Sequence, residues 1–396
     1  MISFLRFCTF SDITNNLWCS MDNQKQLHIA LVANTLWSVY NFRKGLINSF
    51  IKRGYKVTIV GPVDDYAKKL KKLGCSVVDV HIASQGMNPF VDLNLIMKLK
   101  KIYSQIDPDF IFHYTIKPNI YGSIAAWLCN KKSIAVTTGL GFVFNKSSFF
   151  TKVISQLYSF SFNFPKEVWF LNEDDKAVFI SKKIIKEYKS YVLDGEGVDT
   201  QYFSPGKLIK QPDDGVTFLL VARMLWDKGV GIYVEAARKL KVQYPNAKFQ
   251  LLGACDVENP SAISKDVIDS WDKEGVIEYL GVTSDVRQIV SQADCIVLPS
   301  YYREGIPRTL MEAASMAKPL VTTDNVGCRN VVIDGVTGYL CQVKNVDSLA
   351  DAMRNIIQLT PEARNEMGAK GREFMLRRFD EKIIISDYYR AIQKYI

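Results

Sequence analysis

The sequence predicts an α/β protein of two Rossmann-like, doubly wound parallel-sheet domains that face each other across a cleft. Three observations lead to this fold class. The chain has 396 residues, which is the length of two ordinary domains. Short apolar runs alternate with amphipathic helical runs, as in parallel βαβ units. A stretch rich in Gly, Pro and Asp, residues 194–215, separates two halves of similar size.

The first half, residues 21–195, is expected to form one domain. Its strand-like runs are short and rich in β-branched and aromatic residues, and two of its helical runs end at Gly54 and Gly74. We expect strands at 27–33, 56–60, 76–80, 109–113 and 133–137, with helices at 42–51, before Gly74, at 91–105 and at 118–129.

The second half, residues 196–379, repeats this alternation, and a last helix at 380–396 is expected to cross back to the first domain. Residues 1–20 are expected to lie outside the fold, because Met21 opens a second plausible start and no signal-peptide pattern precedes it. In parallel sheets, ligands bind at the carboxyl ends of the strands, so the chemistry should lie in loops that follow strands. We expect strands at 216–221, 248–252, 276–280, 295–299 and 319–322, and helices at 229–243, 261–273, 284–292, 307–317, 346–358 and 361–378.

The composition excludes several classes of protein. With 48% hydrophobic and 23% charged residues, the chain is globular rather than disordered. Its eight cysteines form no CxxC pair, which indicates reduced thiols in a cytoplasmic protein. Its three histidines are far apart, so no histidine-based metal site is expected. No run of about 18 apolar residues predicts a transmembrane helix.

The net charge of +9 is unevenly distributed. Residues 1–200 carry 25 Lys+Arg and 16 Asp+Glu, whereas residues 201–396 carry 25 of each. This asymmetry favours an anionic partner for the first half, such as nucleic acid, an acidic lipid surface or a phosphorylated substrate. The alternative is a basic, solvated surface. Nothing besides the charge supports nucleic-acid binding.

The strongest motif follows the strand at 295–299. Pro307 is placed to open a helix, so the backbone N–H groups of Arg308 and Thr309 should point into the cleft, where they and the helix dipole suit a phosphate. Glu304 precedes this helix and Glu312 lies inside it, so one carboxylate can face a sugar and the other a ribose. The alternative is an ordinary helix start with surface glutamates.

A second motif follows the first strand of the second half. Arg223 and Lys228 are separated by a short loop, so both cations can converge on one anion. A diphosphate leaving group needs such cations when no metal is present. The alternative is a basic strand–helix loop.

These residues carry a resemblance to the family 4 glycosyltransferases. The spacing of Glu304 and Glu312 matches the E-x7-E signature of that family, and residues 223–229 match its Arg-x4-Lys-Gly pair. The linker at 195–205 is similar to its Gly-Ser-Gly-Val-Asp signature, with Glu196 in place of Ser, and Gly327 with residues 334–338 matches a further loop. The resemblance implies the GT-B fold, a nucleotide-sugar donor, retention of anomeric configuration and no metal or other cofactor.

The first half resembles a narrower branch of the family. Residues 34–43, 113–122 and 138–141 are similar to segments of bacterial enzymes that build capsule, O-antigen or N-linked glycans on polyprenyl-diphosphate acceptors, often from UDP-N-acetylhexosamines. The Gly-Gly turn of the family is absent. Its His-x-His pattern is not kept either: Tyr114 takes the aligned position and His113 lies one residue away.

The resemblance implies a role for each matched residue. Arg223 and Lys228 bind the donor diphosphate, Glu304 holds sugar hydroxyls and Glu312 holds the ribose. His113 is the candidate catalytic histidine. Front-face retention lets the leaving phosphate oxygen take the acceptor proton, so no separate base is required. Further donor contacts are expected from Gly305, Ile306, Pro307, Arg308, Thr309 and Val282, and acceptor contacts from Lys117, Arg43 and Asn119.

A membrane surface is the other expected partner. Residues 146–165 are aromatic and apolar at helical spacing, and an amphipathic helix beside a basic domain can lie in a membrane interface. Core packing of this stripe is the alternative. The literal D-x-D at 107–109 is interpreted as a turn rather than as a metal site.

The sequence therefore predicts a metal-independent, retaining glycosyltransferase with a UDP-sugar donor and a polyprenyl-diphosphate glycan acceptor, associated peripherally with the inner face of a bacterial cytoplasmic membrane. Two alternatives stay open. One is a sugar-nucleotide epimerase or hydrolase of the same fold, and the other is a catalytically silent membrane assembly partner.

Overall fold

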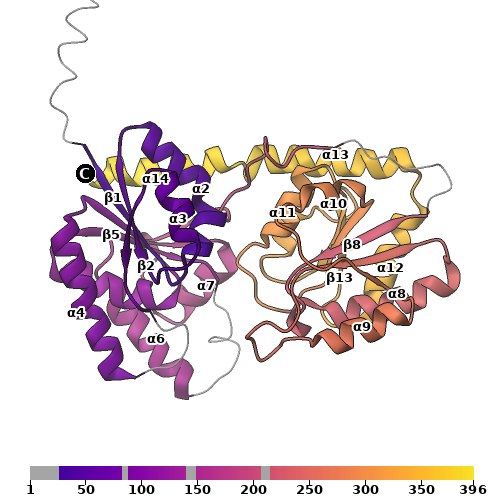
Figure 1. Ribbon diagram of the computed structural model, residues 1–396, viewed down its shortest axis with the longest axis horizontal. Helices are drawn as coiled ribbons and strands as arrows, with labels where there is room; N and C mark the ends of the chain where they lie inside the picture. Colours follow the sequence, from indigo (N-terminus) through magenta and orange to yellow (C-terminus); the bar gives the residue numbers. More distant parts are fainter. Residues whose placement is uncertain (1–25, 83–87, 140–148, 207–214) are drawn as a thin grey trace, which may run out of the picture.

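The described residues form two parallel β-sheets, one of seven strands and one of six, with helices on both faces of each (Figure 1). The structure is a computed structural model that describes residues 26–82, 88–139, 149–206 and 215–396. The expected extension at residues 1–20 lies outside the described residues. Because both sheets are wholly parallel and doubly covered, the predicted fold class is confirmed.

The seven-stranded sheet belongs to the first domain and has the strand order β3-β2-β1-β4-β5-β6-β7. Helices α2, α3 and α14 pack on one face, and α4, α5, α6 and α7 pack on the other. The elements are β1 (His28–Val32), α2 (Leu36–Lys52), β2 (Lys56–Gly61), α3 (Tyr66–Lys72), β3 (Ser76–Asp79), α4 (Pro89–Ile106), β4 (Phe110–Tyr114), η1 (Pro118–Gly122), α5 (Ser123–Leu128), β5 (Lys132–Thr137), α6 (Phe149–Ser161), β6 (Glu167–Phe170), α7 (Glu173–Ser181), η3 (Glu187–Lys189) and β7 (Ser190–Val192).

The six-stranded sheet belongs to the second domain and has the order β10-β9-β8-β11-β12-β13. Helices α8, α9 and α12 pack on one face, and α10, α11 and α13 pack on the other. The elements are β8 (Thr217–Val221), η4 (Trp226–Lys228), α8 (Val230–Gln243), β9 (Lys248–Leu252), α9 (Lys265–Lys273), β10 (Glu278–Tyr279), α10 (Arg287–Gln292), β11 (Cys295–Leu298), α11 (Arg308–Ser315), β12 (Leu320–Thr323), η5 (Arg329–Val331), β13 (Gly338–Cys341), α12 (Val346–Gln358), α13 (Pro361–Arg378) and α14 (Glu381–Tyr395).

Some elements differ from the sequence prediction. Strands β6, β7 and β13 and helix α7 were not predicted, because their apolar runs of three or four residues are too short to show a period. The single helix expected at 118–129 is a π-helical turn, η1, followed by the α-helix α5. A π-helical turn carries one extra residue per turn, which shifts the side chains after it around the helix axis.

The apolar stripe of α6 packs into the first domain. Ile154 and Tyr158 are buried against the core beneath α4 and α5, and Leu157 is partly buried there. The core-packing alternative therefore holds for the described part of this stripe, although Phe160 stays exposed. Among the described helices, none combines the length and apolar character needed to cross a membrane.

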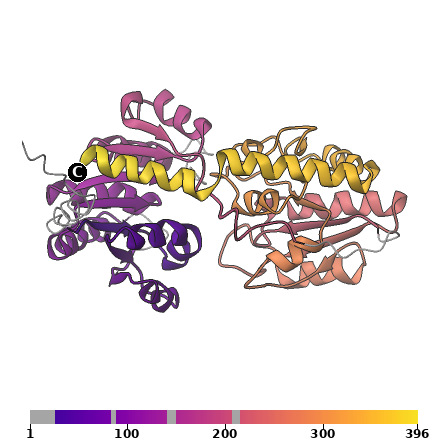
Figure 2. The ribbon, with the colours of Figure 1, turned by 90° about the horizontal axis from the view of Figure 1, so that it is seen from above.

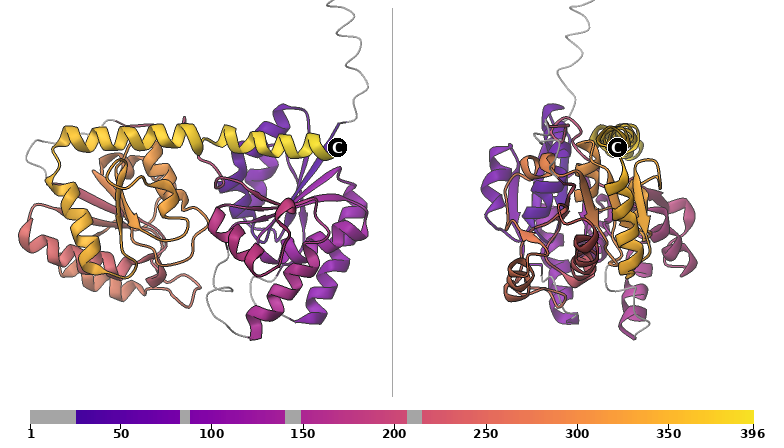
Figure 3. Two further views of the ribbon diagram at one scale, coloured as in Figure 1. Left: turned by 180° about the vertical axis from the view of Figure 1, so that it is seen from behind. Right: turned by 90° about the vertical axis from the view of Figure 1, so that its right-hand side faces the viewer.

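The chain crosses between the domains twice, at neighbouring positions. Helices α13 and α14 run end to end along one side of both domains, and α14 lies on the first (Figures 1 and 2). The view from behind shows the same path (Figure 3). Where they meet, Val198 N of the interdomain linker donates to Phe379 O at 2.8 Å, and Glu381 N donates to Val198 O at 3.0 Å. The buried Ile384 and Tyr388 of α14 then join the first-domain core.

Candidate active site between the domains

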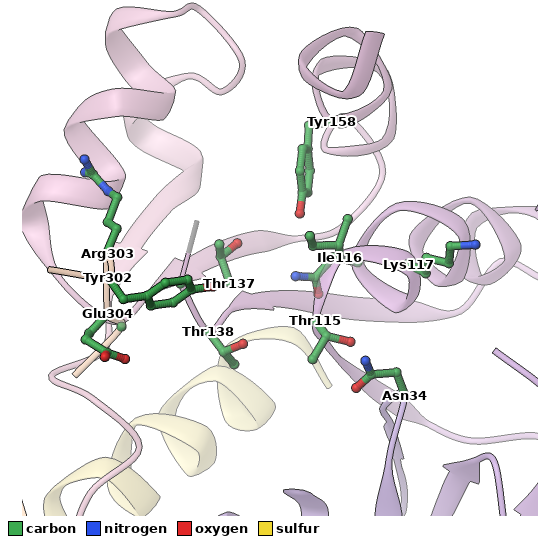
Figure 4. A pocket seen from close by; sticks show the side chains of 13 residues that line it. Asn34, Thr115, Ile116, Lys117, Thr137, Thr138, Tyr158, Tyr302, Arg303 and Glu304 are labelled. Atoms are coloured by element: carbon green, nitrogen blue, oxygen red, sulfur yellow. The ribbon is translucent and has the colours of Figure 1, made fainter. Parts of the chain in front are cut away.

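A cavity of about 270 Å³ lies between the two domains (Figure 4). Its first-domain wall comes mostly from residues at or after the ends of strands β1, β4 and β5, with Tyr158 added from α6. Its second-domain wall comes from the loop after β11. This is the carboxyl edge of both sheets, where parallel α/β folds bind ligands. The wall includes Asn34, Thr115, Ile116, Lys117, Asn119, Thr137, Thr138, Gly139 and Tyr158 from the first domain, and Tyr302, Arg303, Glu304 and Gly305 from the second.

Glu304 of the second-domain wall forms an ion pair with Lys228, which lies outside the lining residues. Glu304 is 8% exposed, and its Oε1 accepts from Lys228 Nζ at 2.5 Å and from Ser300 Oγ at 2.9 Å. The two residues follow different strands, β8 and β11. Asp227 O ties these loops together by accepting from Tyr301 N at 3.0 Å and from Tyr302 N at 3.1 Å.

The glycine that follows Lys228, Gly229, makes a backbone contact that requires glycine. Its φ is +77°, in the left-handed region, and a Cβ added there would lie 2.1 Å from Pro299 O. Only a residue without a side chain lets the Lys228 loop approach β11 so closely.

The loop that carries Glu304 also contacts the first domain. A Cβ added at Gly305 would lie 2.5 Å from Thr138 O, and Asn172 Nδ2 donates to Gly305 O at 2.9 Å. Arg303 Nε donates to Asp175 Oδ1 at 2.8 Å, and Asp175 is completely buried. Burial raises the pKa of Asp175, and the Arg303 guanidinium opposes that rise. The two domains are therefore closed on each other at the cavity.

The second carboxylate of the E-x7-E motif, Glu312, lies on α11 outside the cavity wall. Its Oε1 accepts from Arg308 Nε at 3.0 Å, while Arg308 also donates to Phe42 O of the first domain at 3.3 Å. Burial raises the pKa of Glu312, and Arg308 opposes the rise. Pro307 is the N-cap of α11 rather than its first residue, and Thr309 lies in the first helical turn.

Other predicted donor residues are spread around this centre. Arg223 is exposed. Burial raises the pKa of Tyr302, and the charge of Arg223 opposes that rise. Val282 is 70% exposed after β10, and Ile306 is buried beside the linker residue Gly195. The structure thus brings Lys228, Glu304 and Gly305 together and leaves Arg223 and Val282 on the surface.

His113 does not line the cavity, so this geometry does not support its predicted catalytic role. It is fully buried, and its Nε2 lies 3.0 Å from Tyr103 Oη of α4. Burial lowers the pKa of His113 to about 3. The aligned Tyr114 points to the opposite face of the sheet, where its Oη donates to Tyr388 Oη at 3.1 Å. Neither residue can contact a ligand in the cleft.

The two predicted acceptor cations are already paired. Arg43 is buried, forms an ion pair with the linker residue Glu196 and stacks its guanidinium 3.7 Å from the centre of the Tyr114 ring. In this structure Arg43 therefore contacts the linker, and its predicted contact with an acceptor is not supported by this geometry. Lys117 Nζ lies 3.1 Å from Asp92 Oδ1, and Figure 4 shows its side chain turned away from the cavity.

Sequence reasoning missed several residues of the cavity wall, notably Asn34, Thr115, Thr137 and Tyr302. Each follows or ends a strand at the carboxyl edge, and that position was the signal that could have identified them. Asn119, which was predicted, does line the cavity. Within the described ranges, no three His, Cys, Asp or Glu side chains are grouped so that they could hold a metal ion.

Comparisons with known proteins agree with this geometry. A family model described as glycosyl transferases group 1 matches residues 207–374, and one described as glycosyl transferase 4-like matches residues 28–172. The N,N'-diacetylbacillosaminyl-diphospho-undecaprenol alpha-1,3-N-acetylgalactosaminyltransferase of Campylobacter jejuni is 30% identical over 93% of this chain and 99% of its own length. The capsular polysaccharide biosynthesis glycosyltransferase CapM of Staphylococcus aureus is 23% identical over 92% of this chain and 95% of its own.

A solved structure shows the same fold. Anabaena HepE in complex with UDP superposes with a TM-score of 0.75 at 17% identity, covering 93% of this chain and 100% of that one. Both domains, their order and the whole length therefore match, and the chain belongs to the group 1, family 4 glycosyltransferases of the GT-B fold.

Proposed function

We propose that this glycosyltransferase moves an N-acetylhexosamine from a UDP donor to a polyprenyl-diphosphate-linked glycan, with retention and without a metal, in bacterial surface-polysaccharide synthesis. One observation carries the proposal: Glu304, which is paired with Lys228, lines one wall of the interdomain cavity, opposite a polar wall of the first domain. The C. jejuni relative, by its name, acts on a diphospho-undecaprenol acceptor with N-acetylgalactosamine, and HepE holds UDP.

The residues of the second domain suit a sugar diphosphate. Lys228 and the exposed Arg223 offer positive charge for a leaving diphosphate, and a preorganised cation stabilises charge that develops in the transition state. Glu304 can accept hydrogen bonds from sugar hydroxyls once its partner turns to phosphate. Glu312, paired with Arg308 in this structure, is free to take ribose hydroxyls when that pair opens.

The proposed reaction needs no separate basic side chain. The anomeric C–O bond to phosphate breaks, the acceptor oxygen bonds the same face of that carbon, and the acceptor proton passes to the departing phosphate oxygen. His113 cannot serve as the base, because it is enclosed by the protein.

Peripheral association with an anionic membrane surface is part of the proposal. The start of α4 exposes Phe90, which is 85% accessible, together with Leu93 and Met97, and lysines follow on the same helix. Apolar side chains beside cations favour a lipid interface.

UDP release from a panel of UDP-sugars tests the proposal, with and without a polyprenyl-diphosphate glycan, in the presence of chelator. We expect release that depends on the acceptor, survives chelation and falls by about 100-fold in Glu304→Ala, while NMR of the product shows the anomeric configuration of the donor. Glu278→Ala, an exposed carboxylate on β10, is the matched control. Release without acceptor would indicate an epimerase or hydrolase instead, and neither release nor donor binding would indicate a silent protein.

A further inference from the structure

Three buried polar atoms in the first-domain wall have no hydrogen-bond partner among the residues that the structure describes. They are Thr115 Oγ1, Asn119 Oδ1 and Thr137 Oγ1, none of which makes a hydrogen bond within the described part of the chain. All three residues line the cavity, and Asn119 and Thr137 are only 1% and 2% exposed. A buried polar group without a partner costs free energy, so such atoms gather where a ligand supplies the missing bonds.

Irregular backbone holds two of these residues in place. Thr115 has a φ of +70°, a left-handed conformation that a β-branched residue rarely adopts. Asn119 is carried by the π-helical turn η1, and its N donates to Thr115 O at 3.0 Å. Strain of this kind persists where the surrounding structure fixes a functional side chain. Figure 4 shows Thr115 and Thr137 on one side of the cavity and Glu304 on the other.

The donor and acceptor capacity of the three atoms defines the ligand. Asn119 Nδ2 already donates to Val136 O at 3.0 Å, which fixes the amide so that its Oδ1 can only accept. Its ligand must therefore donate a hydrogen bond. A sugar hydroxyl or an acetamido N–H can do so, whereas an ionised phosphate oxygen cannot. The threonine hydroxyls can donate or accept.

The charges nearby agree with a neutral ligand. Lys117 is paired with Asp92 and Arg43 with Glu196, so the two cations expected for the acceptor diphosphate are engaged elsewhere. We propose that Thr115, Asn119 and Thr137 form a carbohydrate subsite that binds the terminal sugar of the acceptor, not its diphosphate. The assignment of this sugar to the acceptor rests on the proposed function, whereas the affinity of the subsite for a carbohydrate does not.

Isosteric variants test the subsite through kinetics. Thr115→Val and Thr137→Val each remove a hydroxyl and keep the side-chain shape. We expect the acceptor KM to rise about tenfold in each. The donor KM should stay unchanged, and the melting temperature should be equal or higher because an unpaired buried hydroxyl is lost. Thr137→Ser, which restores the hydroxyl, should restore the acceptor KM.

Ser123→Ala is the matched control. Ser123 Oγ is also buried and without a partner among the described residues, but Ser123 lies on α5 outside the cavity wall. Its acceptor KM should equal that of the wild type.

Ligand-observed NMR with methyl N-acetylglucosaminide and methyl N-acetylgalactosaminide on UDP-saturated protein gives a second readout, independent of turnover. The glycoside should bind the wild type and Ser123→Ala, bind the two valine variants more weakly, and resist displacement by inorganic pyrophosphate.

Normal turnover with an unchanged acceptor KM in both valine variants would overturn the subsite and leave the proposed function standing. A rise in the donor KM alone would have the same meaning. Displacement by pyrophosphate would also overturn the subsite. If the glycoside binds, the valine variants weaken that binding, and no turnover is seen, the proposed function is overturned and the subsite is supported. If the protein shows no glycoside binding and no turnover, both proposals are overturned.

Discussion

His113 illustrates what a strand does to a single side chain. In β4, alternate residues face opposite sides of the sheet, so Phe112 and Tyr114 pack toward α2 and α14 while His113 packs toward α4. Its ring also lies so close to Gly122 that a Cβ there would be 2.5 Å from His113 Cδ2. The imidazole is therefore a buried, neutral core residue.

The pH dependence of stability follows from this burial. A histidine titrates near 6.5 in the unfolded chain and His113 at about 3 in the folded one, so the unfolded state binds more protons between these values. The stability tied to neutral His113 is complete above pH 6.5 and is lost as the pH falls toward 3, by about 1.4 kcal/mol per pH unit.

Urea unfolding of the wild type and of His113→Asn between pH 7 and pH 5 measures this loss. The free energy of unfolding should fall more gently with acid in the variant, because asparagine takes no proton. His28, whose pKa burial also lowers, is present in both proteins and cancels. Equal slopes would show that His113 is not enclosed as the structure has it.

At the scale of elements, two loops after β8 and β11 build the centre of the site. They meet because Gly229 allows a contact that any side chain would prevent, and because Asp227 O accepts hydrogen bonds from the facing loop. The Lys-Gly pair is thus one feature: the glycine sets the distance at which the lysine meets Glu304.

Gly229→Ala should separate this close contact from simple backbone strain. Gly275 has nearly the same φ, +76° against +77°, but nothing lies within 4 Å of a Cβ added there. Gly275→Ala should cost about 1 kcal/mol and leave turnover unchanged. Gly229→Ala should cost more and lower kcat/KM by about tenfold or more, because the Lys228 loop must move away from β11. Equal effects of the two variants on turnover would contradict this role of Gly229.

The elements also show how far the sequence predicts this molecule. Long periodic helices such as α8, α12 and α13 were predicted within about one residue, because helix period and caps are local signals. Lys228 and Glu304 were both predicted to lie in loops after strands, but the ion pair between them was not predicted. Thr115 and Thr137 also lie at strand ends, so their position could have identified them as cavity residues. Their proposed role could not be predicted, because it depends on the left-handed backbone of Thr115 and on hydroxyls without a partner among the described residues. The ion pair of Arg43 with Glu196 was not predicted, because the two residues lie 153 positions apart in the sequence.

At the scale of the whole molecule, two sets of contacts lie between or beside the domains, one near the linker and one at the cavity. Near the linker, Arg43, Glu196, Tyr114 and Tyr388 join α2, the linker, β4 and α14. At the cavity, Arg303 and Gly305 reach across to α7 and its cap. Because the first set lies beside the chain crossings, we expect it to persist as a hinge while the second set makes and breaks as the domains close and open.

Arg303→Met should open the unliganded protein. The variant leaves Asp175 buried and charged in the closed form, which costs about 3 kcal/mol and is relieved when opening rehydrates the carboxylate. Small-angle X-ray scattering should therefore give a larger radius of gyration than for the wild type at pH 8.

Two further measurements on Arg303→Met identify the cause as the unpaired carboxylate. Burial already raises the pKa of Asp175, and losing Arg303 raises it more, so acid should protonate Asp175 and close the variant again toward pH 5. Asp175→Asn in the same background should restore closure at pH 8.

Arg329→Met is the matched control. Arg329 Nη2 lies 3.7 Å from Asp174 Oδ1 of the first domain, both side chains are about 40% exposed, and such exposed ion pairs contribute little to stability. A radius of gyration that is unchanged in Arg303→Met, or equally increased in Arg329→Met, would mean that Arg303 does not hold the cleft closed.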